Sequence, residues 1–277
     1  MEDLDRSPVP DYPSLLRLDG RTFVVVGAGQ GMGRQTAHAL ASAGAHVACA
    51  DLDKDRAGHV AVEIAGTAYQ VDAADPEQIE AMLTAVRAQA GRIHGICDVI
   101  GMARWSKVTE MPDEDWDWSF DLVLRHAYLL IKIGGRMMAE DGGGAITCVS
   151  SISGISSAPY HGAYGAYKAA MISFVRTASV ELAPANVRVN TIAPGAVATP
   201  RLARDRGLDV ASMADGSLTK MAQTADIGSA MLYLSSDLGK HVNGHTLVVD
   251  GGTINKFPIP LDGADARTPG SVIGSRG

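Results

Sequence analysis

The sequence predicts an α/β fold, a single domain in which a doubly wound parallel sheet carries helices on both faces. Two observations support this prediction. Short apolar runs of strand-forming residues alternate along the chain with longer stretches of helical character. A glycine-rich turn joins the first apolar run to the first helical stretch. Units that alternate in this way form parallel sheets with right-handed crossovers.

The expected strands share valine, isoleucine, alanine and cysteine and are bounded by turn residues. They cover residues 23–26, 45–50, 68–71, 95–100, 145–149, 187–192 and 246–249. Helices are expected at residues 34–43, 76–90 and 225–235, and a further helix is expected to begin at Trp116. Pro76 follows Asp75, and a proline is favoured in the first helical turn because its missing N–H has no intrahelical partner there.

The domain is expected to span residues 18–254 of the 277-residue chain. Residues 1–17 are rich in proline, aspartate and serine, which predicts an N-terminal arm. Residues 255–277 contain three prolines and predict a meandering C-terminal tail. Length alone allows one large domain or two small ones, but the motifs described below span nearly the whole chain. We therefore expect one domain.

Composition argues against several classes of protein. The formal net charge of −7 disfavours a nucleic-acid partner, which requires a basic face. The sequence contains no run of eighteen apolar residues, so no membrane span is predicted. The acidic N-terminus lacks the apolar core of a secretory signal. Each of the three cysteines, Cys49, Cys97 and Cys148, falls inside an expected strand. We expect them to be small buried residues of a protein in a reducing compartment and not disulfides or metal ligands. We therefore expect a cytoplasmic protein.

Neither histidines nor arginines predict a further site. The eight histidines have no zinc-like spacing, so no metal centre is expected. Arg201, Arg204 and Arg206 form a small basic cluster, which is expected to be a solvated loop and not a phosphate site.

The glycine-rich turn has the context of a dinucleotide-binding fingerprint. Residues 27–33 read Gly-Ala-Gly-Gln-Gly-Met-Gly and lie between an expected strand and an expected helix. The glycines let the backbone approach a pyrophosphate at the helix N-terminus, as in Rossmann folds. Asp51 ends the second expected strand, where a carboxylate accepts hydrogen bonds from ribose hydroxyls and repels a 2′-phosphate. With no arginine at Gln30 or Leu52, the sequence predicts NAD and not NADP.

Tyr164 and Lys168 are spaced for acid/base chemistry. Side chains at i and i+4 share one face of a helix, so the ammonium is expected to lower the pKa of the phenol from about 10. Such a tyrosine exchanges a proton with an alcohol or ketone, and Ser151 can hydrogen-bond the substrate oxygen. By spacing alone, Tyr167 and Lys168 equally fit a solvated helix edge.

With these motifs in this order, the chain resembles the short-chain dehydrogenase/reductase family from about residue 18 to 253. The match continues through residues 190–199 and ends at Asp250-Gly251-Gly252. The resemblance implies catalysis by Ser151, Tyr164 and Lys168. The cofactor contacts that it implies, together with the glycine turn, are Gly27, Gly29, Gln30, Gly31, Met32, Gly33, Asp51, Leu52, Asp72, Ala73, Val99, Gly101, Tyr164, Lys168, Pro194, Gly195, Val197 and Thr199.

The resemblance also implies where a substrate binds. The expected pocket residues are Met102, Trp105, Ser153, Tyr160, His161 and Leu202. Most are apolar, which favours a bulky, weakly polar alcohol or ketone over a sugar or an acid. Relatives use the segment matching residues 201–220 as a lid, although a plain surface helix fits equally well. His161 fits a capping or surface role as well as substrate contact, and the family also implies a homo-oligomer, a dimer or a tetramer.

Two departures from the family pattern concern proton transfer. The chain reads Asp98-Val99-Ile100-Gly101 where the family usually has Asn-Asn-Ala-Gly. Val123 stands where the family has an asparagine that helps hold a water between the lysine and solvent. Backbone carbonyls or Asp98 are the groups available to support a water instead.

The sequence therefore predicts an NAD-dependent oxidoreductase that interconverts a bulky, mostly apolar secondary alcohol and its ketone. The alternatives are a catalytically weak or inactive NAD-binding protein and an NAD-using epimerase or lyase on the same fold. The two departures support the weak or inactive alternative, whereas the intact Ser-Tyr-Lys set supports the oxidoreductase.

Overall fold

The protein is described by a computed structural model that covers residues 5–218 and 220–255. The tail predicted at residues 255–277 lies outside these residues, apart from Asn255. Leu18, at the expected start of the domain, is fully buried. Within the predicted arm, Pro13–Leu16 form a 3₁₀ helix in which Leu15 and Leu16 are half-buried.

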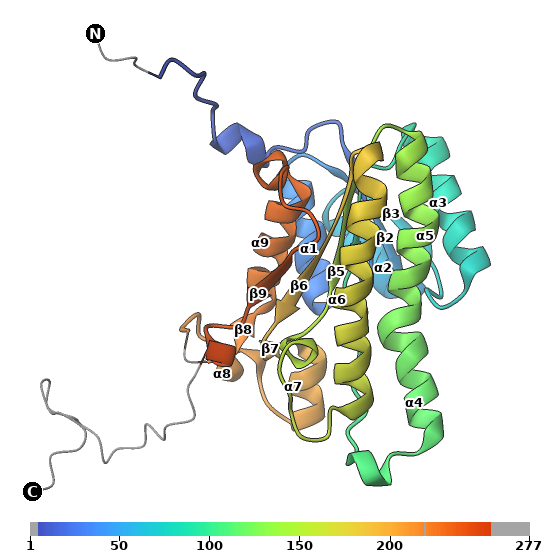
Figure 1. Cartoon of the computed structure of the whole chain (residues 1–277), viewed down its shortest axis with the longest axis vertical. Helices are drawn as coiled ribbons and strands as arrows, with labels where there is room; N and C mark the ends of the chain where they lie inside the picture. The colour runs from blue at the N-terminus through green and yellow to red at the C-terminus, as the bar shows by residue number, and fades with distance from the viewer. Residues whose placement is uncertain (1–4, 219, 256–277) are drawn as a thin grey trace, which may run out of the picture.

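Seven parallel strands form the central sheet, in the order β3-β2-β1-β4-β5-β6-β9 (Figure 1). The strands are β1 (Thr22–Val26), β2 (His46–Asp51), β3 (Thr67–Gln70), β4 (Gly95–Asp98), β5 (Gly144–Val149), β6 (Val187–Pro194) and β9 (Thr246–Val249). The chain order reverses between β1 and β4, and ligands of such sheets bind at the carboxyl ends of the strands at this point. The predicted fold class is confirmed.

Helices cover both faces of the sheet (Figure 1). They are α1 (Gly31–Ser42), α2 (Lys54–Glu63), α3 (Pro76–Ala90), α4 (Asp113–Phe120), α5 (His126–Glu140), α6 (Gly162–Leu182), α7 (Pro200–Arg206), α8 (Val210–Met213) and α9 (Thr224–Ser235). One buried cluster joins the sheet to α1, α2 and α9, and a second joins it to α3, α5 and α6. Short 3₁₀ turns lie at Val108–Glu110, Ile152–Gly154, Ala183–Ala185, Asp237–Gly239 and Thr253–Asn255.

The strands are continuously apolar because both faces of the sheet are covered. Along β1, Val24 and Val26 pack in the cluster with α3 and α5, whereas Phe23 and Val25 pack in the cluster with α1 and α9. This alternation follows from the two-residue period of a strand. All four side chains are at most 1% exposed, so both clusters anchor the strand that leads into the glycine turn.

Two helices begin earlier in the chain than the sequence predicts, because the loops before them are shorter than expected. α1 begins at Gly31 and not at Arg34, so the glycine turn runs directly into the helix. α4 begins at Asp113, three residues before Trp116, because Pro112 is its extended N-cap. The start of α3 at Pro76 is confirmed, and the Asp75 carboxylate accepts a hydrogen bond from the Glu77 amide at 2.9 Å.

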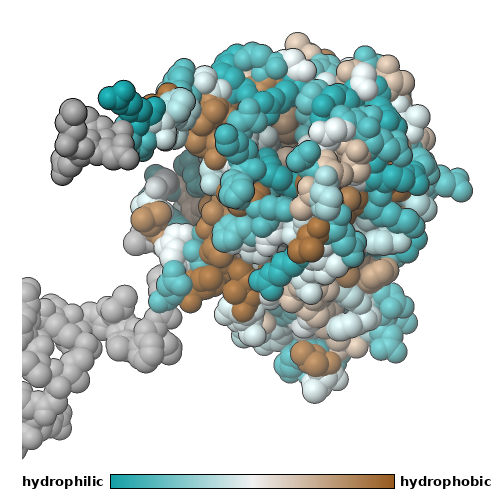
Figure 2. Space-filling model, turned by 45° about the horizontal axis from the view of Figure 1, so that its top comes forward, coloured by the Kyte–Doolittle hydropathy of each residue, from teal (hydrophilic) through white to brown (hydrophobic). Residues whose placement is uncertain are grey.

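Two further features position the site. Asp121–Arg125 form a turn of π-helix between α4 and α5, a local widening that often occurs at functional sites. Strands β7 (Val197–Ala198) and β8 (Ala222–Gln223) pair at the base of the segment expected to be a lid. Hydrophilic side chains cover most of the face seen in Figure 2, with smaller apolar patches between them. No helix of the described residues is long and apolar enough to cross a membrane.

Candidate active site

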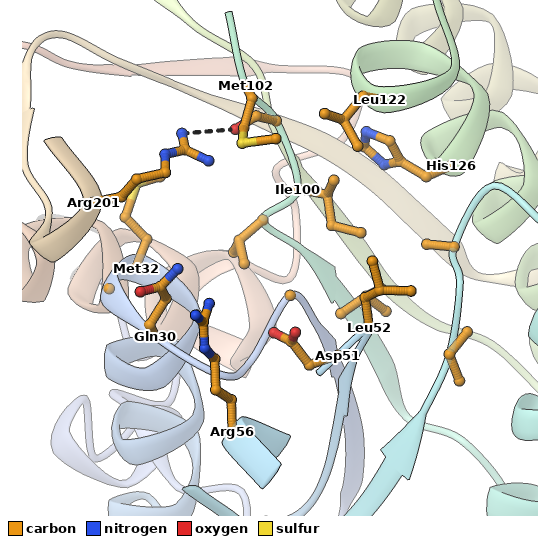
Figure 3. A pocket seen from close by; sticks show the side chains of 18 of the residues that line it. Gln30, Met32, Asp51, Leu52, Arg56, Ile100, Met102, Leu122, His126 and Arg201 are labelled. Atoms are coloured by element: carbon orange, nitrogen blue, oxygen red, sulfur yellow. Dashed lines mark hydrogen bonds between the residues drawn. The ribbon is translucent and has the colours of Figure 1, made fainter. Parts of the chain in front are cut away.

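A cavity lies at the carboxyl ends of β1, β2 and β4 and extends to the start of α7 (Figure 3). Most of the residues predicted to contact a cofactor line it, namely Gly27, Gln30, Gly31, Met32, Gly33, Asp51, Leu52, Asp72, Ala73, Val99, Gly101 and Thr199. The predicted residues that do not line it are Gly29, Tyr164, Lys168, Pro194, Gly195 and Val197. The fingerprint at Gly27–Gly33 and the acid after β2 therefore meet in one site.

The glycine turn brings α1 against β1. A Cβ atom at Gly33 would lie 2.0 Å from the Gly27 carbonyl oxygen, closer than any side chain allows. The Gly27 and Ala28 amides both donate to the Ala50 carbonyl, at 2.8 and 3.0 Å, which ties the turn to β2. Gly31, with φ of +57°, begins the helix. A backbone that leaves no space for a Cβ beside a helix N-terminus fits a dinucleotide pyrophosphate.

Asp51 holds the edge of the cavity through backbone hydrogen bonds. Its Oδ2 accepts from the Gly29 amide at 2.8 Å, and its Oδ1 accepts from the Asp53 amide at 3.0 Å. Gly29 thus acts behind the cavity surface, since its amide fixes the Asp51 carboxylate at the edge of the cavity. Arg56 lies next to Asp51 (Figure 3) and forms an ion pair with Asp53 at 3.1 Å. Sequence analysis did not identify Arg56.

Ser151, Tyr164 and Lys168 come together at the ends of β5 and α6. Ser151 lies close enough to the Tyr164 hydroxyl to lower its pKa by hydrogen bonding, although burial outweighs this effect. The Lys168 ammonium lies 5.8 Å from the centroid of the Tyr164 ring. It donates to two backbone carbonyls, Val149 at 2.6 Å and Ile100 at 3.3 Å. The three predicted residues therefore share one site, with Lys168 beneath the tyrosine.

The expected fall in the tyrosine pKa is not found. Burial raises the pKa of Tyr164, and this effect outweighs the opposing hydrogen bond from Ser151 and the charge of Arg201. The positive charge that opposes burial at Tyr164 is that of Arg201. Burial lowers the pKa of Lys168 itself to about 8, against the opposing effects of Asp98 and Cys148.

Arg201 contradicts the interpretation of the basic cluster as a solvated loop. Its side chain is half-buried, lines the cavity and donates from Nη2 to the Gly101 carbonyl at 3.3 Å. Thr199 caps α7 by accepting from the Leu202 amide at 3.2 Å, and this cap turns the first helical residues toward the cavity. Arg204 and Arg206 are exposed, as expected.

The predicted substrate residues divide into two groups. Met102 lines the cavity, and Trp105, which is 62% exposed, stacks on His161 with ring centroids 4.2 Å apart. The His161 ring in turn lies 5.4 Å from the Tyr164 ring and pairs through Nδ1 with the Ser153 hydroxyl at 2.8 Å. His161 is the N-cap residue of α6 but makes no capping bond with its side chain.

The remaining two residues stand apart from this stack. Tyr160 is 51% exposed and adopts φ of +67°. Leu202 packs against buried Ala203 and Met213 within the predicted lid and does not line the cavity.

Several lining residues were missed, and they are Val26, Arg56, Val71, Ala74, Ile100, Asp121, Leu122, His126, Pro200 and Arg201. Val26 and Val71 were recognisable as the residues at or just after strand ends. Asp121, Leu122 and His126 reach the cavity because of the π-helical turn, which no sequence periodicity announces.

Both departures from the family pattern are deeply buried. Val123 is fully buried, and Asp98 forms a buried pair with His126, in which Oδ2 and Nδ1 lie 2.7 Å apart. Asp98 therefore has a protein partner that the sequence did not suggest.

The whole fold and sequence match known proteins. The family model described as enoyl-(acyl carrier protein) reductase matches residues 27–253. D-threitol dehydrogenase of Mycolicibacterium smegmatis is 32% identical over 243 residues, which cover 85% of this chain and 94% of that protein. The chain is a short-chain dehydrogenase/reductase.

Other members of this family are similar at the same level. 7alpha-hydroxysteroid dehydrogenase of Escherichia coli is 29% identical over 249 residues, covering 87% of this chain and 97% of that protein. A solved 7 alpha-hydroxysteroid dehydrogenase in complex with NADH and 7-oxo glycochenodeoxycholic acid has a TM-score of 0.78 and 27% identity, covering 87% of this chain and 96% of that one. A short-chain type dehydrogenase/reductase from Mycobacterium marinum has a TM-score of 0.80 and 29% identity, covering 87% and 98%.

These similarities support an oxidoreductase of the short-chain kind that uses a nicotinamide cofactor. The cradle at the glycine turn fits such a cofactor, since the N-terminus of α1 at Gly31 and the carboxylate of Asp51 match a pyrophosphate and a ribose.

Proposed function

We propose that this short-chain dehydrogenase/reductase is an NAD-dependent enzyme that interconverts a bulky, mostly apolar secondary alcohol and its ketone. The observation that carries the proposal is the meeting of Ser151, Tyr164 and Lys168 beside the nucleotide cavity. In the proposed reaction Tyr164 takes the hydroxyl proton during oxidation and returns it during reduction. Ser151 hydrogen-bonds the reacting oxygen. The cofactor supplies the hydride acceptor or donor.

The raised pKa of Tyr164 fits the direction of proton transfer in reduction. A phenol that keeps its proton at neutral pH is ready to donate it to a ketone oxygen. For oxidation, positive charge close to the phenol has to offset the effect of burial. The charge of Arg201 already acts in this direction. We therefore assign Arg201 an electrostatic role at the reacting end of the cavity.

The preference for NAD rests on Asp51, whose fixed carboxylate repels a 2′-phosphate. Arg56 beside it favours such a phosphate, so the discrimination is expected to be moderate. The Asp53 carboxylate already pairs with Arg56 and reduces its attraction for a further anion.

The apolar substrate class is supported by the exposed ring of Trp105, which contacts His161 next to Tyr164, and by the exposed ring of Tyr160. Relatives of comparable identity are named for both classes of alcohol, cyclopentanol and a hydroxysteroid on one side, glycerol and threitol on the other. The exposed rings favour the first group for this chain.

The screen that tests the proposal follows the absorbance of reduced nicotinamide with NAD and a panel of alcohols. Cyclopentanol, a 7α-hydroxysteroid and aromatic secondary alcohols represent the apolar class, and glycerol and threitol serve as polar controls. We expect turnover with members of the first group at higher kcat/KM than with the polyols. Faster oxidation of the polyols would overturn the apolar assignment, and turnover only with NADP would overturn the cofactor assignment.

We further propose that the enzyme works in the cytoplasm as a homo-oligomer. The three cysteines are free and buried, as in proteins of reducing compartments. Trp116, Phe120 and Tyr128 expose large aromatic surfaces on α4 and α5, which supports contact with a second copy. Light scattering of the purified chain tests the assembly.

A further inference from the structure

Four ionisable side chains from four different elements are buried together beside the cavity, whose wall includes His126. They are Asp98 of β4, His126 of α5, Cys148 of β5 and Lys168 of α6, each at most 1% exposed. Burying a charge is costly unless another charge or several hydrogen bonds compensate for it. The family chemistry uses only Lys168, so the arrangement of the others needs its own explanation.

Asp98 and His126 hold each other in place by a buried hydrogen bond. Oδ2 of Asp98 and Nδ1 of His126 lie 2.7 Å apart, and an ionised carboxylate accepts such a bond from the imidazole N–H. The other ring nitrogen, Nε2, is buried and has no hydrogen-bond partner among the described residues. The contact with Asp98 is therefore the hydrogen bond that fixes the orientation of this ring.

The Asp98 carboxylate is connected to Lys168 through one loop segment. Oδ1 of Asp98 accepts from the Ile100 amide at 3.1 Å, and the Ile100 carbonyl accepts from the Lys168 ammonium at 3.3 Å. The carboxylate thus fixes the residue whose carbonyl holds the lysine. Asp98 is the strongest of the groups that oppose the effect of burial on Lys168, whose pKa burial lowers to about 8. Burial raises the pKa of the Cys148 thiol well above its ordinary value, so the thiol stays neutral and is not a second counter-charge in this range. Tyr164, on the same helix as Lys168, has its ring centroid 5.8 Å from the ammonium.

The π-helical turn explains why His126 reaches β4. The extra residue in the turn Asp121–Arg125 changes the rotation of the helix, and His126 follows directly as the first residue of α5. Val123 in the same turn is fully buried and offers no hydrogen bond. The polar groups near Lys168 on the side of the π-helical turn are therefore Asp98 of β4 and His126 of α5.

We propose that Asp98 and His126 act as one positioning unit, in which His126 holds the Asp98 carboxylate in place and Asp98 supplies the counter-charge for the Lys168 ammonium beside Tyr164. The role of this unit in turnover rests on the function proposed above, whereas the coupling of charges does not depend on it.

A double-mutant cycle of Asp98→Asn and Lys168→Met, read by thermal unfolding of the full chain between pH 6 and 10.5, tests the coupling without turnover. In the folded protein the pKa of Lys168 is lowered from 10.5 to about 8, so the unfolded chain binds more protons between these values. The stability that the neutral lysine confers is thus fully present above pH 10.5 and is lost as the pH falls to about 8.

We expect the two substitutions to be coupled at pH 7, where Lys168 is charged, and the coupling to fade as the pH rises through 8 to 10.5. In Asp98→Asn alone, the stability should depend on pH down to lower values, because an uncharged amide no longer stabilises the Lys168 ammonium and the pKa of Lys168 falls further. A coupling that is absent at pH 7, or that is the same at pH 7 and 10.5, would show a merely structural contact and overturn the proposal. Asp141→Asn, whose carboxylate pairs with Arg87 at the far end of α5, is the matched control and should show no such coupling.

Two variants of His126 test its share of the unit. His126→Gln retains a side-chain N–H for Asp98, whereas His126→Phe does not. We expect the phenylalanine variant to reproduce the pH curve of Asp98→Asn and the glutamine variant to stay near the unsubstituted protein. A phenylalanine variant with an unchanged curve would contradict the role of His126. If that variant does not fold, the near-isosteric Asp98→Asn cycle still decides the question of charge.

Turnover provides a separate reading. In Asp98→Asn the alkaline limit of kcat should move to lower pH by about one unit, since a lysine without its counter-charge loses its proton earlier. An unchanged alkaline limit would contradict the role of the unit in catalysis. An absence of turnover with every alcohol and ketone would instead count against the proposed function, and the unfolding cycle would still report on the coupling.

Discussion

Two aspartates at the ends of β2 and β4, the strands on either side of β1, have opposite surroundings. Asp51 at the end of β2 lines the cavity, and its carboxylate is held by two backbone amides. Asp98 at the end of β4 is 1% exposed, and its carboxylate is held by an imidazole and one amide. The first arrangement leaves a fixed charge facing a ligand. The second keeps a charge inside the protein, where it acts on Lys168.

The difference shows that the site has two parts. The binding side, at β1 and β2, contacts the cofactor, and the proton side, at β4, β5 and α6, carries the groups that exchange or control protons. On the binding side, most of the contacts available to a cofactor come from backbone groups, so substitutions there should change the affinity for the cofactor. On the side of β4, β5 and α6 the side chains are buried and ionisable, so substitutions there should change turnover and its pH dependence.

Tyr164→Phe removes the proposed acid/base of the proton side, and we expect it to have the largest effect on turnover. The ring is retained but the exchangeable proton is lost, so we expect turnover to fall by about 10² to 10⁴. The Kd for NADH, measured by fluorescence titration, should change by less than about threefold, a difference below 1 kcal/mol. A variant that retains most of its activity would show that Tyr164 is not the acid/base.

Gly33→Ala should break the binding side. The new methyl group would lie 2.0 Å from the Gly27 carbonyl, so the turn has to move, which typically costs 1–3 kcal/mol of stability. We expect the affinity for NADH, followed by fluorescence, to fall by roughly 10- to 100-fold, the equivalent of about 1.4 to 2.8 kcal/mol. Gly58→Ala is the matched control, because nothing lies within 4 Å of its Cβ position in α2. It should stabilise the protein by roughly 0.5–1 kcal/mol and leave NADH binding intact. Equal binding by the two variants would contradict the assigned cradle.

Asp51→Ala should sharpen the assignment of the cofactor. Removal of the carboxylate ends the repulsion of a 2′-phosphate and leaves Arg56 free to attract one. We expect the ratio of the Kd values for NADPH and NADH to fall by roughly tenfold, about 1.4 kcal/mol. Arg56→Ala in the same background should restore part of the ratio. Tighter binding of NADPH by the unsubstituted protein would already refute the preference for NAD.

Val123→Asn should have the smallest effect on chemistry and a clear effect on stability. The site is fully buried, and an amide without partners there costs about 1–3 kcal/mol, visible as a lower Tm. With Asp98 and His126 already supporting Lys168, turnover should stay unchanged or rise. Val180→Asn, at a position 74% exposed on α6, is the control and should leave Tm nearly unchanged. Activity that appears only with asparagine at position 123 would favour a non-catalytic protein.

The fold and the binding side could be predicted from the sequence because their causes are local. The apolar runs, the glycine turn and the acid after β2 are each determined by residues close together in the chain. Strand bounds differ by at most two residues from the expected ones, as at β4, which ends at Asp98 and not at Ile100.

The proton side could be predicted only in part, because it depends on contacts between distant segments. The sequence places Tyr164 and Lys168 on one helix face but does not show that two backbone carbonyls hold the ammonium. The partner of Asp98 is 28 residues away and reaches it through a π-helical turn. Arg201 was misjudged for the same reason, since its side chain is held by the carbonyl of Gly101, 100 residues away in the chain.

The central claim is that hydride moves between the cofactor and a carbon whose oxygen exchanges a proton with Tyr164. NADH deuterated at the transferable position of nicotinamide C4, incubated with the ketones of the apolar panel, tests it directly when the product alcohol is examined by mass spectrometry. We predict one deuterium on the carbinol carbon of the product of the unsubstituted enzyme and its near absence with Tyr164→Phe. Bound cofactor that delivers no deuterium to any ketone, or equal delivery by the phenylalanine variant, would contradict the account.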